Sequence, residues 1–525
     1  MSNQANPTGL PPFALDYRAS GVLLPVTSLP SPYGVGDMGP SAFAWVDRLH
    51  EVGQSWWQAL PLGPTDYGNS PYQSLSSFAG NGLLVSPELL ISDGLLHSSA
   101  CEGQTFPSTS VDYDAVTQFK LRLLNQVWGH VKAGLRKDLR SAYEQFCHMH
   151  AHWLEDYALF RALKQKYHGM SYLEWPEDLV RRSTAAMTEA RKELSQQIDK
   201  VRLAQFLIFQ QARRLKEYAN AQGIKLIGDL PFYVSPDSSD VWAHAELFLL
   251  DDKCRPRFVG GVPPDYFSAD GQLWGNPVYD WDALRRTGFR FYIERLRALL
   301  ALVDVIRLDH FRAFAGAWHV PADAKTARAG QWIPGPGAEF FSKVKKELGA
   351  LPLIAEDLGV ITPNVCALRD EFRIPGTRVL QFAFDGNSDN PHLPANYSTN
   401  TVVYTGTHDN DTTRGWFESL PEAEQGKVWS CLNRKEGDGR KIAAELLRVA
   451  WSSAAALAIV PLQDLFNLGS EARMNLPGTA EGNWRWRAPE DMLNASVFEQ
   501  LKDLTASSNR LCLPRGSAVA KAAQA

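Results

Sequence analysis

The chain has 525 residues, 45% of them hydrophobic and 21% charged, and a formal net charge of −5 at pH 7. A chain of this length buries a sizeable core, and it has room for one large barrel with insertions or for three ordinary domains. The slightly acidic balance gives no reason to expect nucleic acid or an acidic membrane surface as a partner.

The six cysteines are scattered without CxxC spacing, so they predict neither a disulfide framework nor a structural zinc site, and they favour a reducing compartment. The first residues lack the basic region and the apolar region of a secretory signal. No apolar stretch reaches the length of about 20 residues that spans a membrane. We therefore expect a cytoplasmic protein, although a processed organellar protein has the same sequence features.

Eight short apolar runs that end in Pro, Gly or acidic residues recur along the chain. Runs this short and continuous are typical of strands buried on both faces, as in a parallel sheet covered by helices. They lie at 21–29, 56–64, 225–231, 302–310, 351–359, 378–384, 402–410 and 454–466.

Helical patterns separate several of these runs, for example SAFAWVDRLHEVG and YIERLRALLALV. Repeated strand–helix alternation predicts a parallel α/β fold, and eight such strands fit a closed TIM (β/α)8 barrel. A doubly wound open sheet is the structural alternative, and the number of strands favours the barrel. We therefore predict one (β/α)8 catalytic domain over residues 1–525.

Two intervals depart from simple alternation. From about residue 79 to 222 the pattern is strongly helical, as in FKLRLLNQVW and RLAQFLIFQQARRLKEY, which predicts a helical insertion between the second and third strands. From about residue 248 to 281 the chain is dense in Pro, Gly and aromatic residues, which predicts an ordered loop over the active site.

Carboxylates stand where several of the apolar runs end. Asp309, Glu356 and Asp409 close three runs in the second half of the chain, and Asp229 lies at the end of an earlier one. In a TIM barrel, catalytic groups come from the C-terminal ends of the strands and from the loops that follow them. We therefore expect these carboxylates to meet at the barrel mouth.

Arg307 precedes Asp309 by two positions. Because side chains alternate along a strand, the two share a face, which points into the barrel mouth. An arginine beside an aspartate favours the ionised carboxylate, as a nucleophile requires. A lone RxD motif is more often a structural ion pair, but this one closes a buried run and two other runs end in acids, which favours catalysis.

Retaining glycoside chemistry uses one carboxylate as nucleophile and a second as acid and then base, through a covalent glycosyl-enzyme. Three strand-end carboxylates supply these groups and add negative charge beside an oxocarbenium-like centre. Paired acids also bind Mg²⁺ or Ca²⁺, but Arg and His residues beside them disfavour a hard metal. We therefore expect no metal and no cofactor.

Four segments, GDLPFYV, RLDHFR, AEDLG and THDN, resemble the signature regions of the α-amylase clan in the version of glycoside hydrolase family 77, the amylomaltases or 4-α-glucanotransferases. Other segments are also similar to that family, including SLPSPYGVGDMG, GPTDYGNSPYQS, IPGTRVLQFAF and NLPGTAEGNWRWR. The most specific is VPPDYFS…GQLWGNP, because general amylases lack it. The similarity runs from about residue 21 to 487, nearly the whole chain.

The resemblance implies a role for each strand-end carboxylate. Asp309 is the nucleophile, Glu356 is the general acid/base, and Asp409 holds donor-sugar hydroxyls and stabilises the transition state. Arg307 orients Asp309 in this scheme. A retaining mechanism of this kind needs Glu356 to carry a raised pKa when it first acts, and burial near the other carboxylates provides that shift.

The same resemblance implies a set of substrate-binding residues. Two histidines hydrogen-bond the donor sugar, one aspartate of the first signature region supports the ring, and aromatic and amide side chains line the glucan groove. For the aromatic residues ordinary loop or barrel packing is the alternative. The histidines are His310 and His408, and the aspartate is Asp229. The groove-lining residues are Tyr67, Tyr72, Gln272, Trp274 and Phe382, and Arg307 also belongs to the set.

A glycine-rich segment at 34–39 matches GxGxxG and follows a predicted strand, as in a dinucleotide-binding site. The acidic residue expected roughly 20 residues further on is missing from GQSWWQALPLG. We therefore expect these glycines to shape the first strand–helix loop.

The carboxylates do not decide whether water or a sugar hydroxyl attacks the covalent intermediate. A transferase must hold an acceptor and keep water scarce, which calls for aromatic platforms and covering loops. The resemblance favours transfer, with α-1,4-glucans and malto-oligosaccharides as donor and acceptor. The alternatives are an α-1,4-glucan hydrolase with the same carboxylates and a non-catalytic glycan binder.

Overall fold

The computed structural model describes residues 9–264, 268–434, 437 and 439–511. Eight parallel strands close into a barrel in the order β1-β12-β11-β10-β9-β6-β3-β2. Each of the eight apolar runs overlaps one of these strands, so the predicted TIM barrel is confirmed. The strands are β1 Ala19–Leu23, β2 Trp56–Gln58, β3 Lys225–Leu230, β6 Val305–Leu308, β9 Leu353–Ala355, β10 Gly376–Val379, β11 Thr401–Tyr404 and β12 Leu457–Pro461.

Side-chain alternation separates the barrel interior from the outer layer. One buried cluster takes residues from all eight strands, including Val305 and Ile354, and therefore fills the interior. Their neighbours Ile306 and Leu353 belong to the large cluster that also contains the covering helices. Because the side-chain period of a strand is two, the residues two positions after Val305 and Ile354 also face the interior, at its C-terminal end.

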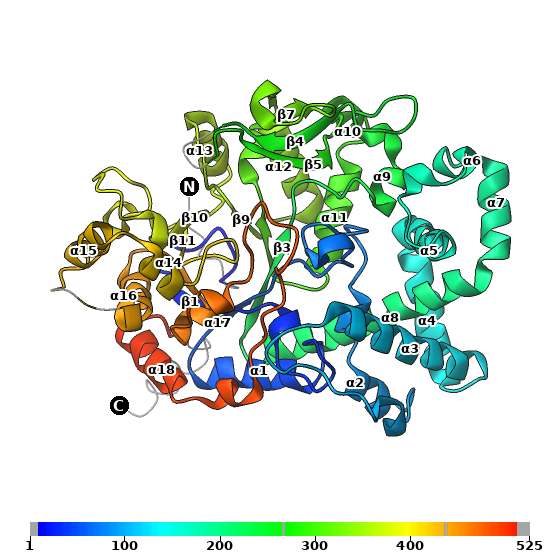
Figure 1. Ribbon diagram of the computed structural model, residues 1–525, viewed down its shortest axis with the longest axis horizontal. Coiled ribbons are helices and arrows are strands. Elements are labelled where there is room, and N and C mark those ends of the chain that lie inside the picture. The colour runs from blue at the N-terminus through cyan, green and yellow to red at the C-terminus, as the bar shows by residue number, and fades with distance from the viewer. Residues whose placement is uncertain (1–8, 265–267, 435–436, 438, 512–525) are drawn as a thin grey trace, which may run out of the picture.

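Helices cover the outside of the barrel (Figure 1). In α1, buried Ala42, Trp45, Val46 and Leu49 form one apolar stripe at helical spacing, and Pro40 occupies the first turn, where its missing N–H is not needed. The helices outside the β2–β3 interval include α1 Pro40–Glu51, α10 Trp281–Arg286, α11 Arg290–Leu300, α12 Gly337–Leu348, α13 Pro363–Glu371, α14 Thr413–Ser419, α15 Glu422–Cys431, α16 Gly439–Ser452, α17 Leu462–Leu465 and α18 Val497–Ser507.

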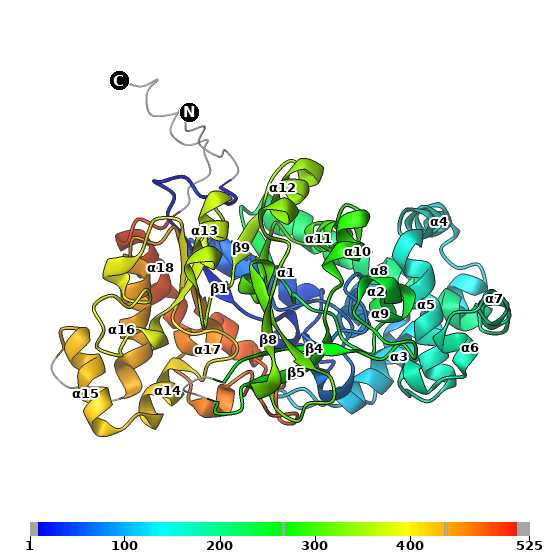
Figure 2. The same cartoon turned by 90° about the horizontal axis from the view of Figure 1, so that it is seen from above.

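Between β2 and β3 the chain forms a group of helices that lies to one side of the barrel, coloured from blue through cyan to green in Figures 1 and 2. The longest of them, α8, carries buried Gln205 and Gln211, whose side chains accept hydrogen bonds from the backbone N–H groups of Gly80 and Ser86. These bonds hold the segment after β2 on the helix. The helices are α2 Pro87–Ser92, α3 Tyr113–Lys132, α4 Arg140–Met149, α5 Ala151–Lys166, α6 Glu177–Val180, α7 Thr184–Glu193 and α8 Ser195–Ala221.

A second sheet of four antiparallel strands has the order β5-β4-β7-β8. Segment 248–281, expected to be an ordered loop, contributes two of its strands, and residues 265–267 of this segment lie outside the described part. The sequence of this segment is rich in Gly and Pro and shows no strand pattern. It forms strands because β4 pairs with β7, from further along the chain, and β5 pairs with β4. The strands are β4 Phe258–Val262, β5 Gln272–Pro277, β7 Gly316–Pro321 and β8 Gln331–Pro334.

Short helices and 3-10 turns complete the connections, including α9 Ser239–Ala243 after β3 and a 3-10 turn at Phe311–Phe314 after β6. Within the described residues, no helix is both long enough and apolar enough to cross a membrane.

Candidate active site

An arginine and two aspartates meet at the C-terminal ends of β3 and β6. Arg307 Nη1 lies 2.9 and 2.7 Å from the two carboxylate oxygens of Asp229 and 3.1 Å from Oδ1 of Asp309. Tyr72 donates from its hydroxyl to Oδ2 of Asp229 at 2.8 Å. The Asp229 side chain is fully buried, whereas that of Asp309 is 29% exposed. Asp309 is therefore the aspartate of this group that a substrate can reach.

Glu356 follows β9 and is held by backbone amides of two segments. His310 N donates to Glu356 Oε2 at 2.7 Å, and Leu358 N donates to Oε1 at 3.2 Å. Backbone bonds from Glu356 N to Leu308 O and from Phe311 N to Glu356 O, both 3.0 Å, tie the same two segments together. The position of Glu356 is thus set by the turn that carries Asp309.

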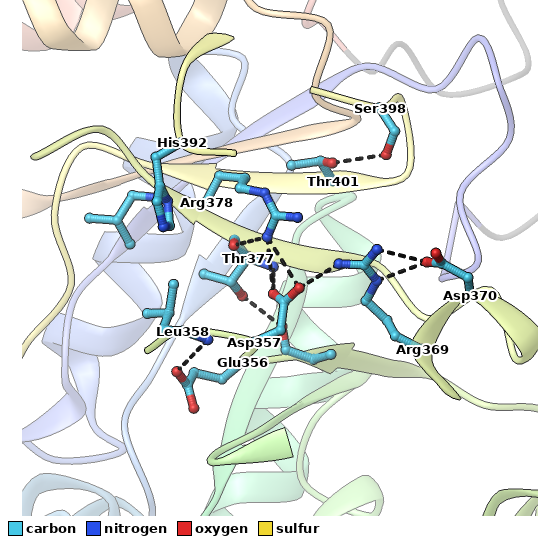
Figure 3. Close-up of polar contacts among 12 residues, drawn as sticks. Glu356, Asp357, Leu358, Arg369, Asp370, Thr377, Arg378, His392, Ser398 and Thr401 are labelled. Atoms are coloured by element: carbon cyan, nitrogen blue, oxygen red, sulfur yellow. Dashed lines mark hydrogen bonds and ion pairs between the residues drawn. The ribbon is translucent and has the colours of Figure 1, made fainter. Parts of the chain in front are cut away.

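The adjacent carboxylate, Asp357, points to the other side of the strand end (Figure 3). It accepts a short hydrogen bond at 2.6 Å from Thr377 N, ion-pairs with Arg369, and lies 3.1 Å from Arg378 Nη1. Consecutive residues at the end of a strand face opposite sides. Asp357 therefore anchors β9 to β10 and α13, while Glu356 faces the barrel mouth.

The third carboxylate, Asp409, lies in the loop after β11, and its side chain is 48% exposed. His408 Nε2 is 3.2 Å from its Oδ2, and Asn475 Nδ2 donates to its Oδ1 at 2.7 Å. The surrounding protein raises the pKa of Asp409 by desolvation, but His408, Asn475 and Arg307 outweigh this and hold the pKa below its usual range. Asp409 is therefore the carboxylate that stays ionised.

The other two carboxyls have raised pKa values. Burial raises the pKa of Asp309 to about 6, although Arg307 opposes the shift, and the negative charge of Asp409 adds to it. Burial likewise raises the pKa of Glu356 well above its usual range, against Arg307 and with a contribution from Asp309. Carboxyls whose environments push their pKa values apart are suited to different roles, one ionised and one protonated.

Aromatic rings form two walls beside the carboxylates. Tyr72 stacks on His408 with ring centroids 5.0 Å apart, and Trp484 lies 5.8 Å from Tyr72. On the side of β5, Trp274 meets His310 edge to face at 4.8 Å and donates to Gln272 Oε1 at 3.1 Å. Stacked and edge-to-face rings of this kind hold one another rigidly and present apolar surface to a flat ligand.

Two of the expected residues are not tied to this group. Phe382 ends a 3-10 turn after β10, is 43% exposed, and has its ring 5.4 Å from His392 rather than beside a carboxylate. The side chain of Tyr67 lies outside the described residues. All the other residues expected at the site are joined by the contacts above.

Asn475 and Trp484 were missed as individual site residues, because they come from a loop more than sixty positions after Asp409 in the chain. The available signal was the segment NLPGTAEGNWRWR, which contains both of them. Arg473 in the same loop donates to Asp409 O at 2.9 Å, so this loop holds Asp409 through both its backbone and its side chain.

Comparisons with known proteins agree along most of the chain. The sequence model of glycoside hydrolase family 77, described as 4-alpha-glucanotransferase, matches residues 24–493. The 4-alpha-glucanotransferase of Synechocystis sp. is 49% identical over 495 residues, which cover 94% of this chain and 98% of that protein. That of Thermus thermophilus is 45% identical over 502 residues, covering 94% and 99%.

Among solved structures, the amylomaltase of Streptococcus agalactiae in complex with acarbose superposes with a TM-score of 0.90 at 37% identity. The match covers 94% of this chain and 99% of that one. The similarity therefore extends over nearly the whole chain.

Proposed function

Because the chain belongs to the 4-alpha-glucanotransferases of glycoside hydrolase family 77, we propose that Asp309, Glu356 and Asp409 carry out glucan transfer by a retaining double displacement. The reaction moves an α-1,4-glucan segment from one malto-oligosaccharide or glucan to the 4-hydroxyl of another. The observation that carries this proposal is the grouping of three carboxyls with different environments at the ends of three barrel strands. No cofactor takes part.

In the first step an Asp309 carboxylate oxygen attacks the anomeric carbon of the donor, and the glycosidic C–O bond breaks. Glu356 gives its proton to the leaving 4-oxygen, and the donor segment remains as an ester of Asp309. In the second step the 4-hydroxyl of an acceptor attacks the same carbon, its proton returns to Glu356, and the ester bond breaks. Asp409, held ionised by its neighbours, stabilises positive charge that develops on the donor ring.

The surrounding residues bind the donor sugar and guide the glucan. Arg307 orients Asp309 and neutralises its charge. Tyr72 and His408 form one stacked platform, with Asp229 fixing the Tyr72 hydroxyl. Trp274 and His310, with Gln272, form the opposite wall. Tyr67 and Phe382 complete the groove for longer glucans in this proposal.

Maltotriose distinguishes transfer from hydrolysis. A transferase conserves the number of glycosidic bonds, so glucose and oligomers longer than maltotriose are expected while total reducing ends stay constant. The measurement combines chromatography of the products with an assay of reducing ends. A rise in reducing ends in step with product formation identifies a hydrolase, and an inert folded protein identifies a non-catalytic binder.

The pH dependence follows from the two raised pKa values. Asp309 must be ionised to attack, so kcat/KM for maltotriose is expected to rise with pH through about 6. Glu356 must be protonated, so kcat/KM falls again at higher pH, where Glu356 loses its proton. Because the two carboxyls interact, the apparent pKa values of the rising and falling limbs of the profile belong to the pair and not to either residue alone. A profile that is flat between pH 5 and 7, by initial rates at subsaturating maltotriose, contradicts this assignment.

We further propose that residues 1–525 form one catalytic domain, in which 79–222 is a helical insertion between the second and third barrel strands and 248–281 covers the active site. The β4–β5 pairing with β7 and the Trp274 contact with His310 support the second part. The scattered cysteines support a cytoplasmic location. Plant relatives, such as that of Solanum tuberosum, are named as chloroplastic/amyloplastic.

A further inference from the structure

Arg312 is a buried cation in the turn that follows Asp309. It lies three residues after Asp309, in the 3-10 turn Phe311–Phe314, and is 7% exposed. Among the described residues, no carboxylate forms an ion pair with it. Burying an unpaired charge is costly, so the hydrogen bonds and ring contacts of the guanidinium have to offset that cost.

The contacts of Arg312 join three separate segments. Its Nη1 donates a short hydrogen bond to Val360 O, four residues after Glu356. Its Nε donates to Gly316 O at 3.4 Å, in β7. The guanidinium also stacks on the Trp332 ring of β8, with Cζ 3.6 Å from the ring centroid. The side chain therefore links the turn after Asp309, the segment after Glu356 and the antiparallel sheet.

The segment that Arg312 holds has few other polar contacts, although the side chains of Leu358 and Ile361 pack against apolar clusters. Gly359 has a φ of +80°, and the Val360 side chain is 51% exposed. In the part of the chain that the structure describes, the Arg312 guanidinium is the one hydrogen-bond partner of the backbone at residues 359–361.

The held segment bears directly on Glu356. Leu358 N donates to Glu356 Oε1 at 3.2 Å, and Leu358 lies between two anchored positions. On one side Asp357 is fixed by its arginine partners, as Figure 3 shows, and on the other Val360 is fixed by Arg312. If the Arg312 bond is lost, the backbone after Leu358 loses its hydrogen bond, and only the packing of the Leu358 and Ile361 side chains is left to hold that side of the Leu358 amide at the Glu356 carboxyl.

We propose that Arg312 is a positioning residue that holds the 356–360 segment, and through it the Glu356 carboxyl, in place for proton transfer, and that Trp332 shields its guanidinium. This inference rests on the proposed role of Glu356 as general acid/base. If Arg312 had a purely structural role, replacing it would lower the thermal stability without changing the enzyme's preference between donors.

The test compares two donors that differ in their need for a proton. Maltotriose needs Glu356 to protonate the leaving oxygen. With α-maltotriosyl fluoride the C–F bond breaks, fluoride leaves without a proton, and the segment bonds to Asp309. For Arg312→Met we expect kcat for maltotriose to fall by about 10- to 100-fold, the size of a misplacement of order 1 Å, with little change in KM. The rate of the first-turnover fluoride burst is expected to stay close to that of the wild type.

Arg312→Lys keeps the charge and can still donate to Val360 O, although without the planar stack, so partial recovery of maltotriose transfer is expected. Trp332 lies on the edge strand β8 and is 39% exposed, so Trp332→Ala can replace Arg312→Met if that variant does not fold. It is expected to slow maltotriose transfer more than the fluoride burst, but less strongly than Arg312→Met. Trp332→Phe keeps a ring face and is expected to behave like the wild type.

Arg510→Met is the matched control, because Arg510 is also buried, 0% exposed against 7% for Arg312, and also bonds to backbone carbonyls, at Ala19 and Trp451. It is expected to lower the melting temperature without changing the ratio of the two donor rates. If Arg312→Met slows the fluoride burst as much as maltotriose cleavage, or slows neither, the positioning role is wrong. If instead the wild type fails to disproportionate maltotriose, or Glu356→Ala shows no donor preference, the proposed function fails.

Discussion

Replacing Asp309 by asparagine is expected to lower maltotriose transfer by about 10⁴-fold or more, because an amide cannot form the glycosyl ester. The fold is expected to survive. Asn keeps the shape, and its Oδ1 can still accept from Arg307 Nη1, as Asp309 does now at 3.1 Å. The measurement is the rate of glucose release from maltotriose by the purified variant.

The melting temperature supplies the control for Asp309→Asn. In the folded chain the pKa of Asp309 is about 6, above its usual value, so at neutral pH ionising it costs folded-state stability. The neutral amide removes this cost, and a melting temperature at or above that of the wild type is expected. Transfer within tenfold of the wild type would show that another group is the nucleophile.

Replacing Glu356 by alanine is expected to lower maltotriose transfer by about 10²- to 10⁴-fold, the range for loss of a general acid/base. Alanine is a better choice than glutamine, because Glu356 accepts from His310 N and Leu358 N on its two oxygens. A glutamine NH₂ would face one of these donors and disturb the loops. The loss should be confined to steps that need a proton.

Two readouts isolate that proton in Glu356→Ala. With α-maltotriosyl fluoride, a burst of about one fluoride per enzyme is expected, because the first step needs no acid but the second lacks its base. Azide, a nucleophile that needs no deprotonation, is expected to restore turnover and to give α-maltotriosyl azide. A fluoride burst as slow as maltotriose cleavage contradicts the acid/base role, and a β-azide product contradicts retention.

Local pattern is sufficient to predict the barrel. A strand buried on both faces reads as a short apolar run whatever its partners are, and eight such runs leave few alternatives to closure. Alternation along β6 then places Arg307 and Asp309 on one face, because the side-chain period of a strand does not depend on tertiary contacts. The contacts of 2.7 to 3.1 Å from Arg307 Nη1 agree with that face assignment.

The second sheet shows where local pattern was insufficient. Segment 248–281 contains β4 and β5, yet its sequence predicts a loop. The reason is that glycines such as Gly260 and Gly261 have a low intrinsic propensity for strands. A Cβ at Gly260 would lie 2.5 Å from the Tyr233 ring, so the glycine is needed for a close approach between segments that no single stretch of sequence reveals.

The sequence by itself determined the fold class, the strand-end carboxylates and the family, since these depend on periodicity and on short motifs. Only the tertiary structure decided what holds each carboxylate. Asn475 on Asp409, the amides of His310 and Leu358 on Glu356, and Arg312 on the segment after Glu356 are contacts between loops. Loop positions depend on the strands they connect and on one another, so these contacts, and the burial that raises the pKa of Glu356, emerge only when the barrel closes.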